Sequence, residues 1–236
     1  MKYKAILFDM DGTLLPMDVK EFTNYYFKMF YKKLAKYNIE LQSFIDAMWK
    51  GVAAMTKNDG SKTNEDVFWD CFESITGLKK EVVGDTCESF YMNEFHAAKA
   101  ATKENPLALK VVQIARSKAD KVVLATNPLF PMVGQISRMS WVGLKPEDFD
   151  LVTSYESDST CKPNPDYFLS VCKRIDVDPK DCLMIGNDCH EDMYAAKLAG
   201  LDTYLVEDCL IEDIKNPYDG LKGSFNDLMD YLSNLD

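Results

Sequence analysis

The sequence predicts an α/β fold in which a doubly wound parallel sheet carries an inserted helical domain. Short apolar runs of strand length recur along the chain, and segments with helical spacing lie between them. Runs that are apolar throughout are typical of strands buried on both faces, and their alternation with helices favours parallel βαβ units. One long stretch after the first run has helical spacing only, which indicates the insertion.

Five segments are expected to form the sheet, four of them short apolar runs and one a weaker pattern. The expected strands are 5–8, 122–125, 149–153 (the weaker one), 183–185 and 203–206. The helical patterns that follow the insertion are 107–119, 165–175 and 191–199.

The segment from about residue 18 to 100 interrupts this alternation. Its apolar residues repeat at helical spacing in four groups, at 22–34, 41–52, 67–75 and 83–91. Four amphipathic helices of this kind would bury their apolar faces against one another as a small bundle. The polar stretch 56–64 is the clearest loop and joins the second and third helices.

The charge, the cysteines and the apolar runs disfavour three classes: nucleic-acid-binding, disulfide-bonded and membrane proteins. The 27 Lys and Arg residues against 38 Asp and Glu give a net charge of -11, which disfavours binding to a nucleic-acid phosphate backbone. The seven cysteines form no CxxC pair and are typical of reduced thiols. No signal-peptide pattern and no apolar run of roughly 20 residues is found. We therefore expect a cytoplasmic protein with no membrane partner, and nothing in the sequence indicates its oligomeric state.

Two carboxylates follow the first expected strand directly. The strand ends in the segment Phe8-Asp9-Met10-Asp11-Gly12-Thr13. Because side chains alternate along a strand, Asp9 and Asp11 are expected to point to the same side, at the edge where open α/β sheets bind ligands. Gly12 permits a tight departure from the strand. A surface turn with acidic residues is the alternative, but it explains the preceding buried run less well.

With three further stretches, this segment resembles the motifs of the haloacid dehalogenase superfamily. The family's DxDGT motif is matched at residues 9–13, its strand-ending Thr or Ser by Thr126, and its Lys before a helix by Lys162. The acidic cluster that closes a later strand is matched at 185–192. The resemblance implies a Rossmann-like core (1–15 and 103–236) and a four-helix cap (16–102), as in the phosphatase branch with a cap after the first motif.

The resemblance also implies a magnesium site. Its ligands would be Asp9, the backbone carbonyl of Asp11 and Asp188. Asp192 would be either a further ligand or a residue that contacts the ligands without touching the metal. The family often has Asp directly after the glycine of this corner, where this chain has Asn187. Of Asn187 and Asp188 we prefer Asp188, because a hard cation favours a charged oxygen.

The roles that the resemblance implies agree with the chemistry of the residues. Asp9 would attack phosphorus and form an aspartyl phosphate, and Asp11 would protonate the leaving alcohol and later deprotonate water. Attack on a phosphate dianion meets a repulsion of about 4 kcal/mol at 4 Å and an effective dielectric near 20. The charge of Lys162 and the hydroxyl of Thr126 would offset it, with Asn127 also contacting the phosphate.

The expected function is magnesium-dependent hydrolysis of a small phosphorylated metabolite. Dehalogenases of the family lack the second aspartate, so Asp11 disfavours dehalogenation. A sugar-phosphate phosphomutase, a phosphonate hydrolase with a Schiff-base lysine, and a non-catalytic binding homologue remain as alternatives. In the cap loop Lys57, Asn58 and Lys62 are candidates for substrate contact, and a solvated loop is the competing interpretation.

Overall fold

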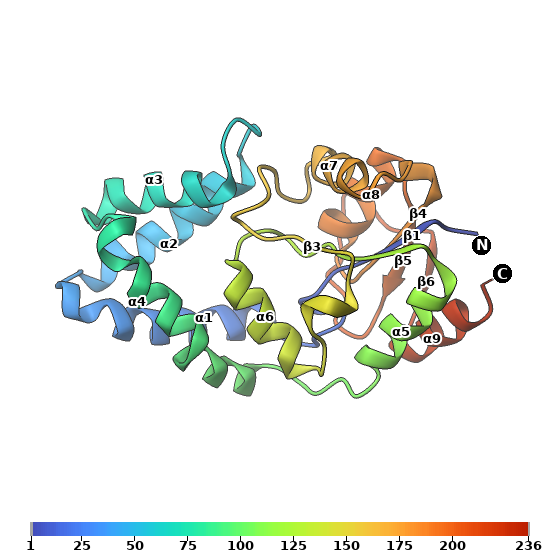
Figure 1. Cartoon of the computed structure of the whole chain (residues 1–236), viewed down its shortest axis with the longest axis horizontal. Helices are drawn as coiled ribbons and strands as arrows, with labels where there is room; N and C mark the ends of the chain where they lie inside the picture. Colours follow the sequence, from blue (N-terminus) through green and yellow to red (C-terminus); the bar gives the residue numbers. More distant parts are fainter. Residues whose placement is uncertain (1, 236) are drawn as a thin grey trace.

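The computed structural model describes residues 2–235 and centres on a six-stranded parallel sheet (Figure 1). The strand order β3-β2-β1-β4-β5-β6 is that of a doubly wound sheet, so the predicted fold class is confirmed. The strands are β1 (Ala5–Phe8), β2 (Lys121–Leu124), β3 (Leu151–Val152), β4 (Cys182–Gly186), β5 (Asp202–Val206) and β6 (Leu221–Gly223).

Each of the five expected segments overlaps a strand, although the weak segment 149–153 shortens to the two residues of β3. The edge strand β6 was not expected. Its sequence Leu-Lys-Gly is short, and two of its three residues are exposed, so it lacks the apolar run that identifies the buried strands.

Helices cover both faces of the sheet. Ile6 and Phe8 of β1 belong to an apolar cluster that includes residues of α5 and α9, whereas Ala5 and Leu7 belong to a second cluster with residues of α7 and α8. The helices of this part are α5 (Ala108–Lys118), α6 (Met132–Trp141), α7 (Pro165–Ile175), α8 (Ala195–Ala199) and α9 (Phe225–Ser233). None of the helices in residues 2–235 is long and apolar enough to cross a membrane.

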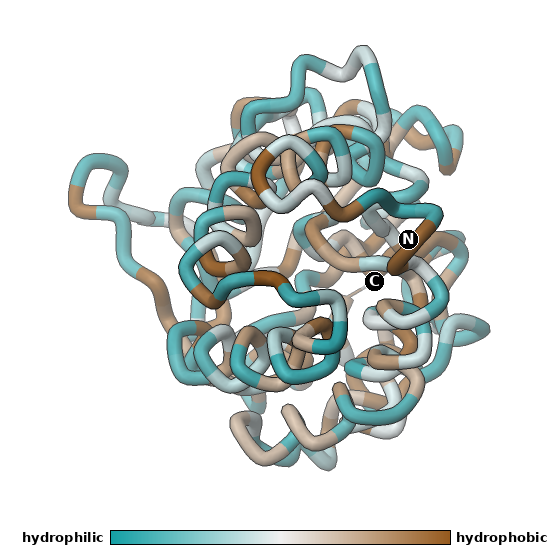
Figure 2. Tube along the Cα trace, turned by 90° about the vertical axis from the view of Figure 1, so that its left-hand side faces the viewer, coloured by the Kyte–Doolittle hydropathy of each residue, from teal (hydrophilic) through white to brown (hydrophobic). Residues whose placement is uncertain are grey.

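The four helical groups of the insertion all form helices, to one side of the sheet (Figure 1). They are α1 (Val19–Leu34), α2 (Leu41–Thr56), α3 (Asn64–Thr76) and α4 (Lys80–Met92), followed by the 3-10 segment Glu94–Ala101. Seen from this end, hydrophobic and hydrophilic stretches alternate along the helices, as amphipathic packing requires (Figure 2).

Two linkers that run side by side join the insertion to the sheet. Met17 and Thr102 form an isolated antiparallel bridge, and the backbone N–H of Lys103 donates to the carbonyl of Pro16 at 2.8 Å. The amide of Asn105 donates to the carbonyl of Leu14 at 3.0 Å. This geometry supports the division at residues 15/16 and 102/103, which we keep as a proposal.

Candidate active site

The carboxyl ends of the three central strands bring distant segments together. Phe8 of β1 is in register with Leu124 of β2 and Ile185 of β4. The next residue, Asp9, is tied to β4 through a 2.9 Å hydrogen bond from its N–H to the Ile185 carbonyl. Parallel strands end at one edge, so Asp9, Thr126 and the acidic segment after β4 meet there.

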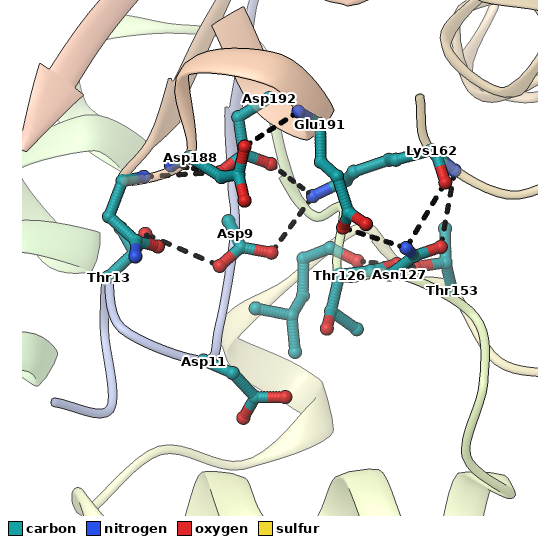
Figure 3. A network of polar contacts seen from close by, with 12 residues as sticks. Asp9, Asp11, Thr13, Thr126, Asn127, Thr153, Lys162, Asp188, Glu191 and Asp192 are labelled. Carbon is teal, nitrogen blue, oxygen red and sulfur yellow. Dashed lines mark hydrogen bonds and ion pairs between the residues drawn. The ribbon is translucent and has the colours of Figure 1, made fainter. Parts of the chain in front are cut away.

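A buried lysine lies at the centre of this edge (Figure 3). Nζ of Lys162, which is 1% exposed, lies 2.9 Å from Oδ1 of Asp9 and 2.6 Å from Oδ1 of Asp192. Burial alone would lower the pKa of Lys162, but the two carboxylates raise it well above its ordinary value. Lys162 is therefore a permanent cation in contact with the predicted nucleophile.

Both carboxylate oxygens of Asp192 form contacts that hold this arrangement. Its second oxygen accepts the backbone N–H groups of Asn187 and Asp188, both at 3.1 Å. Burial raises the pKa of Asp192, and the Lys162 ammonium opposes that rise. A Cβ at Gly186 would collide with the Asp192 carboxylate, so this corner requires glycine. These contacts position Lys162, and the metal role predicted for Asp192 stays a prediction.

The amide of Asn187 is committed as well. The Thr13 hydroxyl lies 2.9 Å from Oδ1 of Asn187 and 3.3 Å from Oδ2 of Asp9, and Nδ2 of Asn187 donates to the Cys209 carbonyl at 2.7 Å. Gly12 has a φ of +93°, and a Cβ there would collide with the Asn187 side chain. Asn187 thus braces the loop that holds Asp9, which leaves Asp188 as the candidate metal ligand of the two.

Asp188 lies where a metal ligand is expected. Its Oδ1 accepts the N–H groups of His190 at 2.7 Å and Glu191 at 2.8 Å and so caps the π-helical segment Cys189–Tyr194, while its side chain lines the same cavity as Asp9 and Asp11. Within residues 2–235 no group of three or more His, Cys, Asp or Glu side chains could hold a metal. Magnesium, however, commonly takes one or two carboxylates together with other oxygens. Asp9, Asp188 and the Asp11 carbonyl fit that requirement chemically.

Asp11 is oriented differently from the expectation. The strand ends at Phe8, so strict alternation does not extend to Asp11, and its carboxylate points away from the Asp9–Lys162 contact (Figure 3). It forms an ion pair with Arg138 of α6, which is fully buried. Burial raises the pKa of Asp11, and the Arg138 guanidinium opposes the rise. Asp11 still lines the cavity with Asp9.

Thr126 and Asn127 follow β2. Within residues 2–235 the Thr126 hydroxyl makes no hydrogen bond, and its side chain lines the cavity, so it is available to a ligand. Asn127 instead hydrogen-bonds to Lys162 and to Glu191. Its Oδ1 accepts the backbone N–H of Lys162 at 3.2 Å, and its Nδ2 donates to the Glu191 carboxylate at 2.9 Å. Asn127 therefore positions Lys162, besides lining the cavity itself.

A cavity of about 690 Å³ lies between this edge and the inserted helices. The loop residues Lys57, Asn58 and Lys62 do not line it. Lys62 pairs with exposed Asp70 at 2.8 Å, and the Asn58 amide bonds within its own loop. The structure brings none of the three to the cavity, and so the geometry gives no support to their predicted contact with substrate.

Two residues of the site were not found from the sequence. Arg138 lies within an unassigned helix, as a single arginine with no spacing that marks it. Glu191 lines the cavity beside Asp188, and burial raises its pKa. Its place in the acidic segment after β4 was the available signal.

Comparisons with known proteins agree with this geometry. The model of the haloacid dehalogenase-like hydrolases matches residues 3–200. A phosphorylated carbohydrates phosphatase of Thermotoga maritima is 24% identical over 199 residues, 84% of this chain and 82% of that protein. A phosphoglycolate phosphatase of Nitrosospira multiformis is 25% identical over 214 residues, 86% of this chain and 82% of that protein.

Solved structures share the fold. The HAD-hydrolase YfnB of Bacillus subtilis, described as bound to magnesium and as revealing interdomain movement, superposes with a TM-score of 0.61 at 19% identity. The match covers 98% of this chain and 99% of that one. The similarity extends over the sheet and the inserted helices together.

Proposed function

The chain belongs to the haloacid dehalogenase-like hydrolases and is a hydrolase of phosphate esters, and we propose that it uses Asp9 as its nucleophile. The substrate is a small phosphorylated metabolite, the intermediate is an aspartyl phosphate on Asp9, and the cofactor is Mg²⁺. The seven free cysteines suit a reducing compartment and support a cytoplasmic location.

One observation carries the proposal: the Asp9 carboxylate lines the cavity while a buried ammonium holds one of its oxygens. The 2.9 Å contact between Lys162 and Oδ1 of Asp9 orients the carboxylate before any substrate arrives. When a phosphate enters, the same cation offsets the repulsion between the two anions. A carboxylate on the floor of a cavity, beside a fixed cation, is the arrangement that nucleophilic attack on phosphorus needs.

The remaining groups have separate tasks. The free hydroxyl of Thr126 donates to a phosphate oxygen, and Asp192 and Asn127 keep Lys162 in place. Asp11 gives a proton to the leaving oxygen and then takes one from the water that attacks the phosphoenzyme. To do so, its carboxylate has to turn from Arg138, its partner here.

Asp9, Asp188 and the backbone carbonyl of Asp11 would hold the magnesium ion. The ion would add positive charge next to the phosphate oxygens, which lowers the barrier to attack by an anion. The magnesium described for the structurally similar YfnB supports this part of the proposal.

A screen of phosphorylated metabolites tests the function, with released phosphate and isomerised product measured together in the presence of Mg²⁺. We expect magnesium-dependent phosphate release, and an acid-quenched reaction should contain one phosphoryl group on the peptide that holds Asp9. Asp9→Asn should lose both signals. Asp59→Asn, a change of the same kind in an exposed loop, should keep them.

Three other outcomes would each contradict part or all of the proposal. Conversion of a sugar phosphate to its isomer with little free phosphate would identify a phosphomutase. Undiminished turnover by Asp9→Asn would remove the nucleophile. Absence of turnover on the whole panel, with no phosphoenzyme, would favour a binding protein without catalysis.

A further inference from the structure

The cavity has two walls of different chemistry. The wall formed by the sheet edge carries the carboxylates, Thr126 and Asn127 described above. The wall formed by the inserted helices is mainly aromatic and aliphatic, with contributions from α1, α2, α3 and α4. Among its residues are Phe22, Phe30, Met48, Val52, Met55 and Phe68.

Few polar groups on the helical wall are free to bind a ligand. The hydroxyls of Tyr26 and Tyr91 lie 2.6 Å apart and bond to each other. Lys20 is the one Lys or Arg that lines the cavity within residues 2–235, and both Lys20 and Asn24 are exposed to solvent. The cationic residues of the site, Lys162 and Arg138, are occupied by carboxylates.

This wall is a poor match for a hydrophilic leaving group. Trp69 of α3 offers one donor, a buried Nε1–H that has no partner within residues 2–235. The other hydroxyls of a sugar that entered this wall would leave water without gaining a hydrogen-bond partner, which costs free energy. A carboxylate on the substrate, in addition to its phosphate, would need a cation inside the cavity, and the helical wall offers only the exposed Lys20. An apolar group on the substrate loses no hydrogen bond to water and needs no cation.

Trp49 supplies a further observation. It lines the cavity, its ring centroid lies 5.1 Å from that of Phe27, and yet 51% of it is exposed. A large exposed aromatic surface that lines an apolar cavity is a typical place for ligand contact. An apolar ligand that covered this indole would remove it from water.

We infer that the substrate of this site is a phosphate monoester of an apolar alcohol, an alkyl chain or an aromatic ring. The phosphate would lie against Asp9 and Thr126, and the alcohol part against the helical wall. This inference rests on the proposed function and narrows its substrate class. It departs from the carbohydrate phosphates and phosphoglycolate named for the relatives.

A homologous series of n-alkyl phosphates, from ethyl to decyl, tests the inference because the leaving alcohols are almost equally basic. With Mg²⁺ present, kcat/KM should rise by about fourfold for each methylene buried, until the cavity is filled. Glycerol 1-phosphate, similar in size to n-butyl phosphate but hydrophilic, should have a kcat/KM at least about tenfold lower than that ester.

Variants on one helix locate the effect. Trp49→Ala should flatten the dependence of kcat/KM on chain length. Leu41→Ala should leave the dependence unchanged, because Leu41 is equally exposed at 51% on α2 but does not line the cavity. Circular dichroism on both variants checks that the helix is retained.

A binding measurement keeps the inference separate from catalysis. Calorimetric titration of the Asp9→Asn protein with non-hydrolysable n-alkylphosphonates should give a Kd that falls with chain length and a negative heat-capacity change. A Kd independent of chain length overturns the inference, with or without turnover. Turnover of glycerol or sugar phosphates above the matched alkyl esters also overturns it, while the phosphatase proposal stands. If the parent protein turns over no phosphate ester while the Kd falls with chain length, the phosphatase proposal is removed and the apolar site is kept.

Discussion

The two walls of the cavity are built on different principles. At the sheet edge, charged side chains are few, and three of the carboxylates face a cation: Lys162 lies between Asp9 and Asp192, and Asp11 faces Arg138. On the helical wall, aromatic rings pack against one another over a wide area, as in the pairs Phe30–Phe90 at 4.7 Å and Phe68–Phe72 at 5.6 Å.

The difference determines how each wall responds to change. A buried ion pair fails when one partner is removed, because the other is left without compensation. An apolar wall depends on summed area and shape, which many sets of residues supply. Substitutions at the sheet edge should therefore affect the reaction and the stability together, whereas substitutions on the helical wall should alter which alcohol is accepted.

The largest effect is expected at Lys162. Lys162→Met keeps most of the side-chain volume but leaves Asp9 and Asp192 facing each other without their cation. We expect kcat/KM to fall by about 10³ or more and the free energy of unfolding to fall by about 3–5 kcal/mol. Steady-state kinetics and urea unfolding measure the two quantities.

Lys57→Met is the matched control, since Lys57 is exposed in the cap loop and does not line the cavity. It should change kcat/KM by less than about twofold and the stability by less than about 0.5 kcal/mol. Retention of activity in Lys162→Met would mean that the sheet edge does not depend on this charge. Loss of activity in Lys57→Met would instead restore the predicted role of the cap loop.

The same difference explains what the sequence could reveal. Asp9, Thr126, Lys162 and Asp188 each follow or precede a recognisable element, so the order of elements in a doubly wound sheet was enough to predict that they meet. The four cap helices were readable because their apolar spacing is regular. These predictions rested on the spacing of apolar residues and on the position of each polar residue next to a strand or helix.

Other features depend on three-dimensional fit, which no pattern records. Arg138 pairs with Asp11 across 127 residues, and nothing in the spacing of α6 marks it. The turn of Asp11 away from Asp9 follows from where the strand ends. The commitment of Asn187 and Asp192 to hydrogen bonds depends on the close approach at Gly12 and Gly186. The lining of the cavity likewise required knowing which apolar residues face the sheet rather than one another.

A smaller effect is expected at Arg138, which is buried beside the sheet edge. Its guanidinium pairs with Asp11 and also lies 4.1 Å from the ring centroid of Phe130, which lines the cavity. Arg138→Met should lower the free energy of unfolding by about 3 kcal/mol, at the lower end for a broken buried pair because the Asp11 side chain is 25% exposed. Urea unfolding at neutral pH measures the change.

A double-mutant cycle with Asp11→Asn isolates the ion pair from the packing of Arg138. With the carboxylate neutralised, Arg138→Met should cost at least about 1 kcal/mol less than in the parent protein. Additive losses would show that the pairing with Asp11 contributes nothing to stability, and that Arg138 stabilises the protein through its other contacts, with Phe130 and Gln135.

The smallest of these effects is expected at Asn64, which joins the cap to the sheet edge without carrying charge. Its fully buried amide accepts from Asn58 at 2.9 Å and lies 3.3 Å from the Pro128 carbonyl, next to Asn127, and 3.3 Å from the Cys161 sulfur, next to Lys162. Asn64→Ala leaves these groups unpaired and should lower the free energy of unfolding by about 2 kcal/mol. It should also lower kcat/KM by a few-fold, because both neighbouring loops hold catalytic groups.

Ser61→Ala is the control for Asn64→Ala: Ser61 is exposed in the neighbouring loop, and its substitution should change neither quantity. If Asn64→Ala lowers stability but leaves kcat/KM and its dependence on the alcohol unchanged, the two walls act independently of the junction between them.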